Sequence, residues 1–353
     1  MPADAHEKST MVSNSAMNNT GVRDSAAVVY LCDEIFDFAT ISGAFFILVF
    51  IFSIAGNSVL LCVLVAYENL KNVTNIFVLN LACSDLIFTF TLPFWATYFL
   101  HHWVFGDLCC KFMIAAYFVG LYSSVILLTA LTVDRFITVV LQNWPCNSVK
   151  RQRWAKGVSA AAWIISIAAS LSDAVHVKAE THWDNFTTCV HPSHNDADVG
   201  HYLQVSLLFF LPLLIIVFCY SAILKTVLKS SNRKRHRTVV VVLCIVAAFI
   251  ICWGPYNFVL FIKFFYEPKS CDAIERLSIV FHICQILAYC HCCMNPLLYM
   301  LSQKLRKHLL HLLPCEKECR KNRERGIGQS TCVIQNTTTM LQNSAVILEM
   351  QCK

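Results

Sequence analysis

The chain has 353 residues, of which 57% are hydrophobic and only 14% are charged. Soluble globular domains carry roughly 25% charged residues, and the mean hydropathy of +0.56 also lies far on the apolar side. This composition excludes an ordinary soluble protein and indicates one that is embedded in a membrane. The net charge of +6 does not predict nucleic-acid binding, because the basic residues gather in short segments between apolar stretches.

The apolar stretches predict helices that cross a bilayer. A bilayer core about 30 Å thick is spanned by about 20 apolar residues in a helix, and none of the stretches alternates as a barrel strand would. The stretches that are long enough cover residues 41–66, 76–100, 111–140, 154–177, 202–228, 238–265 and 277–301. We therefore predict an all-α fold, a seven-helix transmembrane bundle.

Around the bundle we expect three further parts. The transmembrane domain itself covers residues 41–301. The further parts are an N-terminal segment at residues 1–40, a short amphipathic eighth helix at residues 302–313 and a cytoplasmic tail at residues 314–353. The first 38 residues do not resemble a secretory signal. We expect the first span to direct insertion itself.

Basic residues predict the orientation. Lys and Arg gather at residues 150–156, 225–237 and 304–307, whereas the segments before the first and fifth spans are acidic. Because loops rich in Lys and Arg stay in the cytoplasm, we expect a multi-pass plasma-membrane protein with its N-terminus outside. Two sequons, at Asn18 and Asn185, then lie outside and are predicted N-glycosylation sites.

The 19 cysteines divide by compartment. Disulfides form on the outer side, where five cysteines lie: Cys32, Cys109, Cys110, Cys189 and Cys271. The pairs that we expect are Cys110 with Cys189 and Cys32 with Cys271, but Cys109 competes for Cys189 and this choice stays open. The clusters "HCC" and "CEKEC" lack the ligand spacing of a zinc site, so we predict no metal centre of that kind.

Polar residues inside the spans are candidates for function because they are costly in hydrocarbon. Four of them, Asn57, Asp85, Ser124 and Asn295, lie at matching depths in different spans. If they face one another, Asp85 is the only carboxylate at mid-membrane. That arrangement suits a sodium ion or a proton that favours one helix arrangement over another, and a purely structural polar network is the alternative.

Prolines interrupt four of the spans, at Pro93, Pro212, Pro255 and Pro296. Each proline removes a backbone hydrogen bond and kinks its helix. Trp253 precedes one of them by two residues, which places a bulky ring beside a hinge. We predict a bundle with two arrangements.

Several motifs occur in order along the spans: "GNSVL", "NLACSDL", the Asp134–Arg135 pair, Trp163, "CWGP" and "NPLLY". This set resembles the rhodopsin family of G-protein-coupled receptors over about residues 41–313. Within it, "TLP", "WVFGDLCCK" and "HCCMNP" resemble chemokine receptors, and "YENLKNVTNIFVLNLACSDL" resembles receptors for XC chemokines. The resemblance implies a receptor that binds an extracellular chemokine and activates an inhibitory heterotrimeric G protein for chemotaxis and calcium signalling.

The resemblance also implies where the chemokine binds. Acidic residues outside the membrane favour a basic ligand and raise its on-rate. The implied ligand-binding residues are Tyr30, Asp33 and Glu34 in the N-terminal segment, and Trp95, Tyr117, Tyr256 and Gln285 in the bundle. Many chemokine receptors have a glutamate where this chain has Gln285, so an amine of the ligand would meet only a hydrogen-bonding amide here. Asp173 is the candidate for the missing carboxylate, and ordinary interhelical packing is the alternative for the aromatic residues.

On the cytoplasmic side the resemblance assigns the central role to Arg135. It implies pairing with Asp134 at rest and movement toward Tyr220 and the G protein in the active state. The residues implied in activation and coupling are Asp134, Arg135, Tyr220, Trp253, Pro255, Pro296 and Tyr299. The base of the sixth span, "NRKRHRTVV", has no acid that would add a second lock on the arginine. The basic stretch is also expected to touch anionic lipid of the bilayer, with simple retention on the inner side as the alternative.

The tail begins with "LSQKLRKHLLHLL", which is predicted to lie along the membrane surface. Cys315 or Cys319 directly afterwards are predicted palmitoylation sites, and hydroxyl residues beyond them are predicted to be phosphorylated for arrestin binding. Among other classes, an enzyme is disfavoured because no catalytic motif is present, and a transporter or channel because no repeats are visible. A chemokine-scavenging receptor without G-protein signalling stays open, since the Asp-Arg pair is followed by Phe136 rather than tyrosine.

Overall fold

The structure is a computed structural model that describes residues 10–13, 28–31, 38–141, 148–181, 186–190, 195–228, 233–266 and 270–300. The chain divides into two compact units, Met1–Ser302 and Gln303–Lys353. The second unit lies wholly outside the described residues, as does residue 302. The predicted amphipathic helix at residues 302–313 and the predicted palmitoylation sites Cys315 and Cys319 therefore stay predictions.

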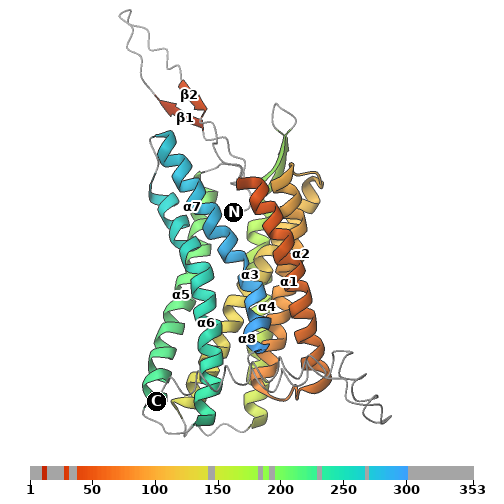
Figure 1. Cartoon of the computed structure of the whole chain (residues 1–353), viewed down its shortest axis with the longest axis vertical. Helices are drawn as coiled ribbons and strands as arrows, with labels where there is room; N and C mark the ends of the chain where they lie inside the picture. Colours follow the sequence, from red (N-terminus) through yellow and green to blue (C-terminus); the bar gives the residue numbers. More distant parts are fainter. Residues whose placement is uncertain are drawn as a thin grey trace, which may run out of the picture. The chain divides into compact units, whose positions relative to one another are not determined.

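Seven helical spans among the described residues are long and apolar enough to cross a membrane, and together they form a bundle (Figure 1). The helices are α1 (Phe38–Tyr67), α2 (Val73–Leu100), α3 (Gly106–Val139), α4 (Ser148–His176), α5 (Asn195–Leu228), α6 (Arg233–Phe265), α7 (Cys271–Tyr289) and α8 (His291–Met300). The seventh span consists of α7 and α8, which are separated by a turn at Cys290. The predicted seven-helix transmembrane fold is confirmed.

Several helices begin earlier than the apolar stretches indicate. α3 begins at Gly106 rather than at residue 111, α4 at Ser148 rather than at 154, and α5 at Asn195 rather than at 202. The added turns contain polar residues such as Asp107 and Lys150. Helical hydrogen bonding does not depend on apolar side chains, so helices continue past the part of a span that hydropathy reports.

Two antiparallel strand pairs accompany the helices. β3 (Lys178–Thr181) pairs with β4 (Thr187–Val190), with Ala179 opposite Cys189. β1 (Thr10–Ser13) pairs with β2 (Val28–Leu31), in the segment that was expected only as an N-terminal extension. The sequence of β2, Val-Val-Tyr-Leu, is rich in the β-branched and aromatic residues that favour strands.

α3 is the central helix of the bundle. It contacts α2, α4, α5 and α6. Within an apolar stretch of 18 residues in each helix, 72% of the residues are buried in α3, compared with 33% in α1, α4 and α5. The outer helices instead expose large apolar side chains, among them Ile164 and Leu171 on α4. Such faces suit contact with lipid.

Two glycines allow neighbouring helices to approach closely. A Cβ on Gly120 of α3 would lie 2.8 Å from the backbone nitrogen of Phe88 in α2. A Cβ on Gly56 of α1 would lie 2.9 Å from the ring of Pro296 in α8. Small residues at helix contacts are typical of membrane bundles, where close van der Waals packing drives association.

Candidate functional site

A disulfide joins the start of α3 to the β3–β4 hairpin. Cys110 and Cys189 are bonded, with their Cα atoms 5.7 Å apart, and both are fully buried. Cys109 is not disulfide-bonded and is partly exposed. The prediction that Cys189 pairs with Cys110 is confirmed, which settles the competition from Cys109. For the other predicted pair, Cys32 and the side chain of Cys271 lie outside the described residues.

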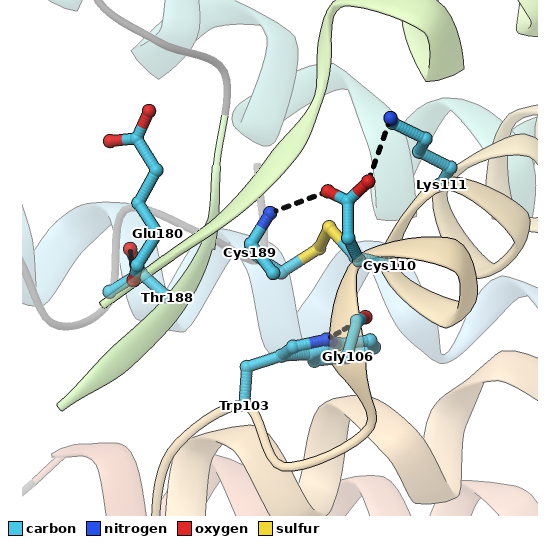
Figure 2. The surroundings of a disulfide bond; sticks show 9 residues. Trp103, Gly106, Cys110, Lys111, Glu180, Thr188 and Cys189 are labelled. Atoms are coloured by element: carbon cyan, nitrogen blue, oxygen red, sulfur yellow. Dashed lines mark hydrogen bonds and ion pairs between the residues drawn. A yellow bond between two sulfur atoms is a disulfide. The ribbon is translucent and has the colours of Figure 1, made fainter. Parts of the chain in front are cut away.

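Hydrogen bonds fasten the same hairpin to α3 (Figure 2). The Asp107 carboxylate accepts a hydrogen bond from the Ala179 amide of β3 at 3.0 Å and forms an ion pair with Lys111 at 2.8 Å. The Trp103 indole donates to the Gly106 carbonyl at 2.8 Å, and the Trp103 amide donates to the Thr187 carbonyl of β4 at 2.8 Å. The hairpin is thus fixed by one covalent bond and by contacts with both of its strands. We call this part of the bundle the disulfide end.

The predicted ligand-binding residues of the bundle are buried. Trp95, Tyr117, Tyr256 and Gln285 are each at most 5% exposed. The ring of Trp95 lies 6.5 Å from that of Tyr117, and the ring of Tyr256 lies 5.7 Å from that of Trp253. The structure therefore places the predicted aromatic residues in two neighbouring pairs, Trp95 with Tyr117 on α2 and α3, and Tyr256 with Trp253 on α6.

Buried polar atoms in this region lack hydrogen bonds of normal geometry. They are the Trp95 indole nitrogen, both amide atoms of Gln285 and the Tyr289 hydroxyl. The Tyr289 hydroxyl nevertheless interacts with the Gln285 amide and the Tyr117 hydroxyl. Buried polar groups are nearly always paired, and an unpaired one costs about 1–3 kcal/mol. The amide of Gln285 can both donate and accept hydrogen bonds, and its neighbour Tyr289 uses only part of that capacity. The geometry suits a ligand that brings polar but not necessarily charged groups.

A continuous series of rings leads from the disulfide end toward mid-membrane. The ring centroids of successive members lie 5.5 Å, 6.5 Å, 5.1 Å and 5.0 Å apart. The members of this aromatic series are, in order, Trp103, Trp95, Tyr117, Phe88 and His291. Sequence analysis did not identify Phe88 or His291, because a phenylalanine in an apolar span carries no distinguishing signal and the histidine was considered only as part of "HCC".

The four polar residues predicted to meet at mid-membrane do come together. The Asp85 carboxylate accepts hydrogen bonds from the Ser124 hydroxyl at 3.2 Å and from the Asn295 amide at 2.7 Å. Asn57 joins indirectly: it bonds to the Ser53 hydroxyl, which bonds to Thr89, which donates to the Asp85 carbonyl at 2.6 Å. We call this set the central polar network.

Asn57 also compensates for a proline. Pro296 has no N–H to donate to the carbonyl one turn earlier, that of Cys292. That carbonyl instead accepts hydrogen bonds from the Asn57 amide at 2.8 Å and from the Ser53 hydroxyl at 3.3 Å. The backbone group freed by the proline is thus satisfied from α1, as the membrane interior demands.

A small cavity lies beside the two residues that donate hydrogen bonds to the Asp85 carboxylate, Ser124 and Asn295. It is lined by Leu81, Ser124, Leu128, Phe249, His291, Met294 and Asn295 and has room for about one water-sized sphere. The His291 ring is 3% exposed, its Nε2 lies 3.8 Å from an Asp85 oxygen, and that nitrogen has no hydrogen-bond partner. Ser124 and Asn295 line this space and bond to the Asp85 carboxylate, and oxygen ligands of these kinds fit one small hard cation. Among the described residues, no group of three or more His, Cys, Asp or Glu side chains is placed to hold a metal ion.

Of the residues predicted to act in activation and coupling, Asp134 and Arg135 lie at the opposite end of α3, which we call the Arg135 end. The Arg135 guanidinium lies 3.5 Å from the Asp134 carboxylate and donates a hydrogen bond to the Thr74 hydroxyl of α2. The shortest contacts of that carboxylate go elsewhere, to Arg151 of α4 at 2.7 Å and 2.8 Å. Sequence analysis interpreted Arg151 only as one of the basic residues that set the orientation.

The other predicted site residues are placed as follows. The Tyr220 hydroxyl of α5 is buried and interacts with Thr132 and Arg135 of α3. Phe136 packs on α5 through Phe218, with ring centroids 5.9 Å apart. Asp173 accepts a hydrogen bond from the Tyr122 hydroxyl at 3.1 Å and is 3% exposed, so its carboxylate is engaged by α3. Outside the described residues or side chains lie Tyr30, Asp33, Glu34, Tyr299, Asn18 and Asn185.

Comparison with known proteins agrees with this geometry. Residues 56–299 match the family described as 7 transmembrane receptor (rhodopsin family). The chain is 39% identical to Chemokine XC receptor 1 of Homo sapiens over 287 residues, which cover 78% of this chain and 82% of that protein. It is 38% identical to Chemokine XC receptor 1 of Mus musculus over 301 residues, 82% and 89% of the two chains.

A relative of another subtype is also similar. The chain is 34% identical to C-C chemokine receptor type 1 of Homo sapiens over 274 residues, which cover 75% of this chain and 77% of that protein. The family match over residues 56–299 includes the spans that carry the aromatic series, the central polar network and the Arg135 end. The chain therefore belongs to the rhodopsin family of seven-transmembrane receptors and, within it, to the chemokine receptors.

Proposed function

We propose that this chain is a receptor for an XC-type chemokine that activates an inhibitory heterotrimeric G protein, leading to chemotaxis and calcium signalling. The aromatic series supports the proposal most directly, because it connects the disulfide end to the edge of the central polar network without a gap. Its last member, His291, also contacts Trp253 at 5.1 Å beside Pro255. A ligand that shifts Trp95 or Tyr117 therefore acts on rings that reach the proline of α6.

The ligand-binding arrangement that we propose has two parts. The N-terminal segment with Tyr30, Asp33 and Glu34 holds the body of the basic chemokine, and the chemokine's own N-terminus enters the bundle at the disulfide end. There Gln285 offers hydrogen bonds but no charge. Cationic small molecules that depend on a glutamate at this position are expected to bind weakly, and Gln285→Glu is expected to improve their binding. Strong competition by such compounds on the unsubstituted receptor would contradict this role of Gln285.

In the membrane, the proposed orientation puts the disulfide end outside and the Arg135 end in the cytoplasm of a plasma-membrane receptor. The basic residues at the start of α4, Lys150, Arg151 and Arg153, support this orientation. Antibody staining of an N-terminal epitope tag on intact cells tests it. Staining only after permeabilisation would place the N-terminus in the cytoplasm and would contradict the proposed orientation. Glycosylation at Asn18 and Asn185, palmitoylation at Cys315 or Cys319 and arrestin binding to the tail belong to the same proposal.

We also propose that a sodium ion beside Asp85 favours one arrangement of the bundle. The small cavity and the oxygens of Asp85 and Ser124 support it. Sodium is expected to lower chemokine affinity in membranes when compared with the bulky cation N-methylglucamine at equal ionic strength. Asp85→Asn is expected to abolish that difference, and a difference that survives the substitution would exclude Asp85 as the ligand.

The experiment that tests the main proposal is G-protein activation in cells that express the chain, challenged with a panel of chemokines. Activation by an XC chemokine, and its loss in Arg135→Ala, is the expected result. Arrestin recruitment without a G-protein response would instead favour a scavenging receptor, the alternative that Phe136 in place of tyrosine leaves open.

A further inference from the structure

Two arginines share the carboxylate of Asp134 unequally. Arg151 donates from Nε to one oxygen at 2.8 Å and from Nη2 to the other at 2.7 Å, a two-point contact. Arg135 reaches only the second oxygen, at 3.5 Å. Hydrogen bonds between a guanidinium and a carboxylate are usually about 2.7–2.9 Å long. The carboxylate is therefore bound to Arg151, and its sequence neighbour is left with a long electrostatic contact.

Arg135 itself is loosely held. Its Nη2 donates to the Thr74 hydroxyl, and its buried Nε has no hydrogen-bond partner. A guanidinium has five N–H donors, and among the described residues Arg135 makes one side-chain hydrogen bond, to Thr74, and lies near the Tyr220 hydroxyl. Within the described part of the chain, the group that the proposed function assigns to G-protein contact is therefore not fixed by a two-point contact with a carboxylate.

The position of Arg151 is unfavourable for α4 taken alone. The residue lies in the first turns of the helix, where the helix dipole disfavours positive charge, and no acidic residue balances it there. Its compensation comes from another helix: Asp134 is 2% exposed, so its charge depends on a close cation. Arg151, at 32% exposure, reaches it from the more open side.

We propose that Arg151 is a positioning residue that regulates coupling. By occupying both oxygens of Asp134, it prevents this carboxylate from binding Arg135 and keeps Arg135 available to the G protein. Without Arg151, the buried carboxylate turns to the other guanidinium that lies beside it in the described part of the chain, that of Arg135. Asp134 then holds Arg135 in place, and activation of the G protein falls. This inference rests on the proposed activation of a G protein.

The test uses the full-length receptor in membranes with a purified inhibitory G protein and a recombinant XC chemokine, and measures nucleotide exchange. Arg151→Gln is expected to lower basal exchange and to reduce chemokine potency about tenfold or more, because it removes two charge-assisted hydrogen bonds and each is worth at least about that factor. Chemokine binding without G protein is expected to stay unchanged. Arg151→Lys keeps the charge but not the two-point contact, and it is expected to cause a smaller loss of exchange. If Arg151→Gln does not reach the membrane, Arg151→Lys is compared with the unsubstituted receptor instead.

A matched control and a second background separate this role from a general structural one. Arg153→Gln makes the same charge change on an exposed residue of the same helix and is expected to leave exchange unchanged. In a receptor that carries Asp134→Asn, adding Arg151→Gln is expected to have no further effect, because the carboxylate that it controls is gone. An equal loss in that background, or an increase in exchange in Arg151→Gln alone, would overturn the inference. An unsubstituted receptor that gives no exchange would overturn the proposed function itself.

Discussion

Replacing Asn57 with alanine removes the side chain that compensates for Pro296. The Asn57 amide donates to the Cys292 carbonyl at 2.8 Å, and within α1 it also lies 3.1 Å from the Ser53 carbonyl and hydroxyl. After the substitution the Cys292 carbonyl keeps only the longer bond from the Ser53 hydroxyl, at 3.3 Å. A backbone acceptor inside the membrane is then poorly satisfied.

The expected cost follows from these contacts. A buried polar group left unpaired costs about 1–3 kcal/mol, whereas hydrogen bonds between membrane helices average about 0.6 kcal/mol in direct measurements. Because the carbonyl retains one weak bond, we expect a loss of about 1–2 kcal/mol. For a domain of this size each kcal/mol shifts the melting temperature by about 2–4 °C, so a fall of about 2–8 °C is expected.

A thermal melt with a thiol-reactive dye measures this loss, since buried cysteines such as Cys219 and Cys292 react only after unfolding. Pro296→Ala supplies the decisive background, because alanine restores an N–H that bonds to the Cys292 carbonyl. In that background Asn57→Ala is expected to cost clearly less than in the unsubstituted chain. Equal costs in the two backgrounds, which is additivity, would refute the compensation.

Three further predictions concern packing, the disulfide and coupling. Gly120→Ala is expected to destabilise the bundle by about 1–3 kcal/mol in the same melt, because its Cβ would lie 2.8 Å from the backbone of Phe88; an unchanged melting temperature would contradict that packing. Cys110→Ser is expected to remove the disulfide, seen by peptide mapping, and to abolish the binding of chemokine at the cell surface. Cys109→Ser is expected to preserve both, and the reverse pattern would assign the disulfide to Cys109. Phe136→Tyr is expected to change nucleotide exchange little, because the ring packs on α5 and one added hydroxyl is worth about 1 kcal/mol; a silent receptor that this substitution activates would contradict it.

The transmembrane fold was predictable because the length of an apolar stretch is a local property. The meeting of Asp85, Ser124 and Asn295 was also predictable, since residues at equal depth in adjacent spans have few other polar partners. The indirect place of Asn57 was not. It depends on the close approach of α1 to α8 at Gly56, a tertiary fact that brings Asn57 to the carbonyl that Pro296 frees.

Other parts of the site depend on helix rotation, which sequence patterns do not report. Cys109 and Cys110 lie about 100° apart around α3, so only one of them faces β4, and the sequence does not say which. Arg151 reads as one more basic residue on the inner side until α4 is placed against α3. His291 likewise becomes significant only when its ring is seen between Phe88 and Trp253.

The continuity of α3 has a mechanical consequence. The helix runs unbroken over 34 residues without an internal proline, whereas α2, α5, α6 and α8 each contain one. From Cys110 to Arg135 it spans about 37 Å at 1.5 Å per residue, and its first turns are covalently tied to β4. A displacement of the β3–β4 hairpin therefore shifts α3 along its own axis or rotates it about that axis, and bends the helix little. The proline-containing helices bend more easily, and they are the helices that rearrange around α3.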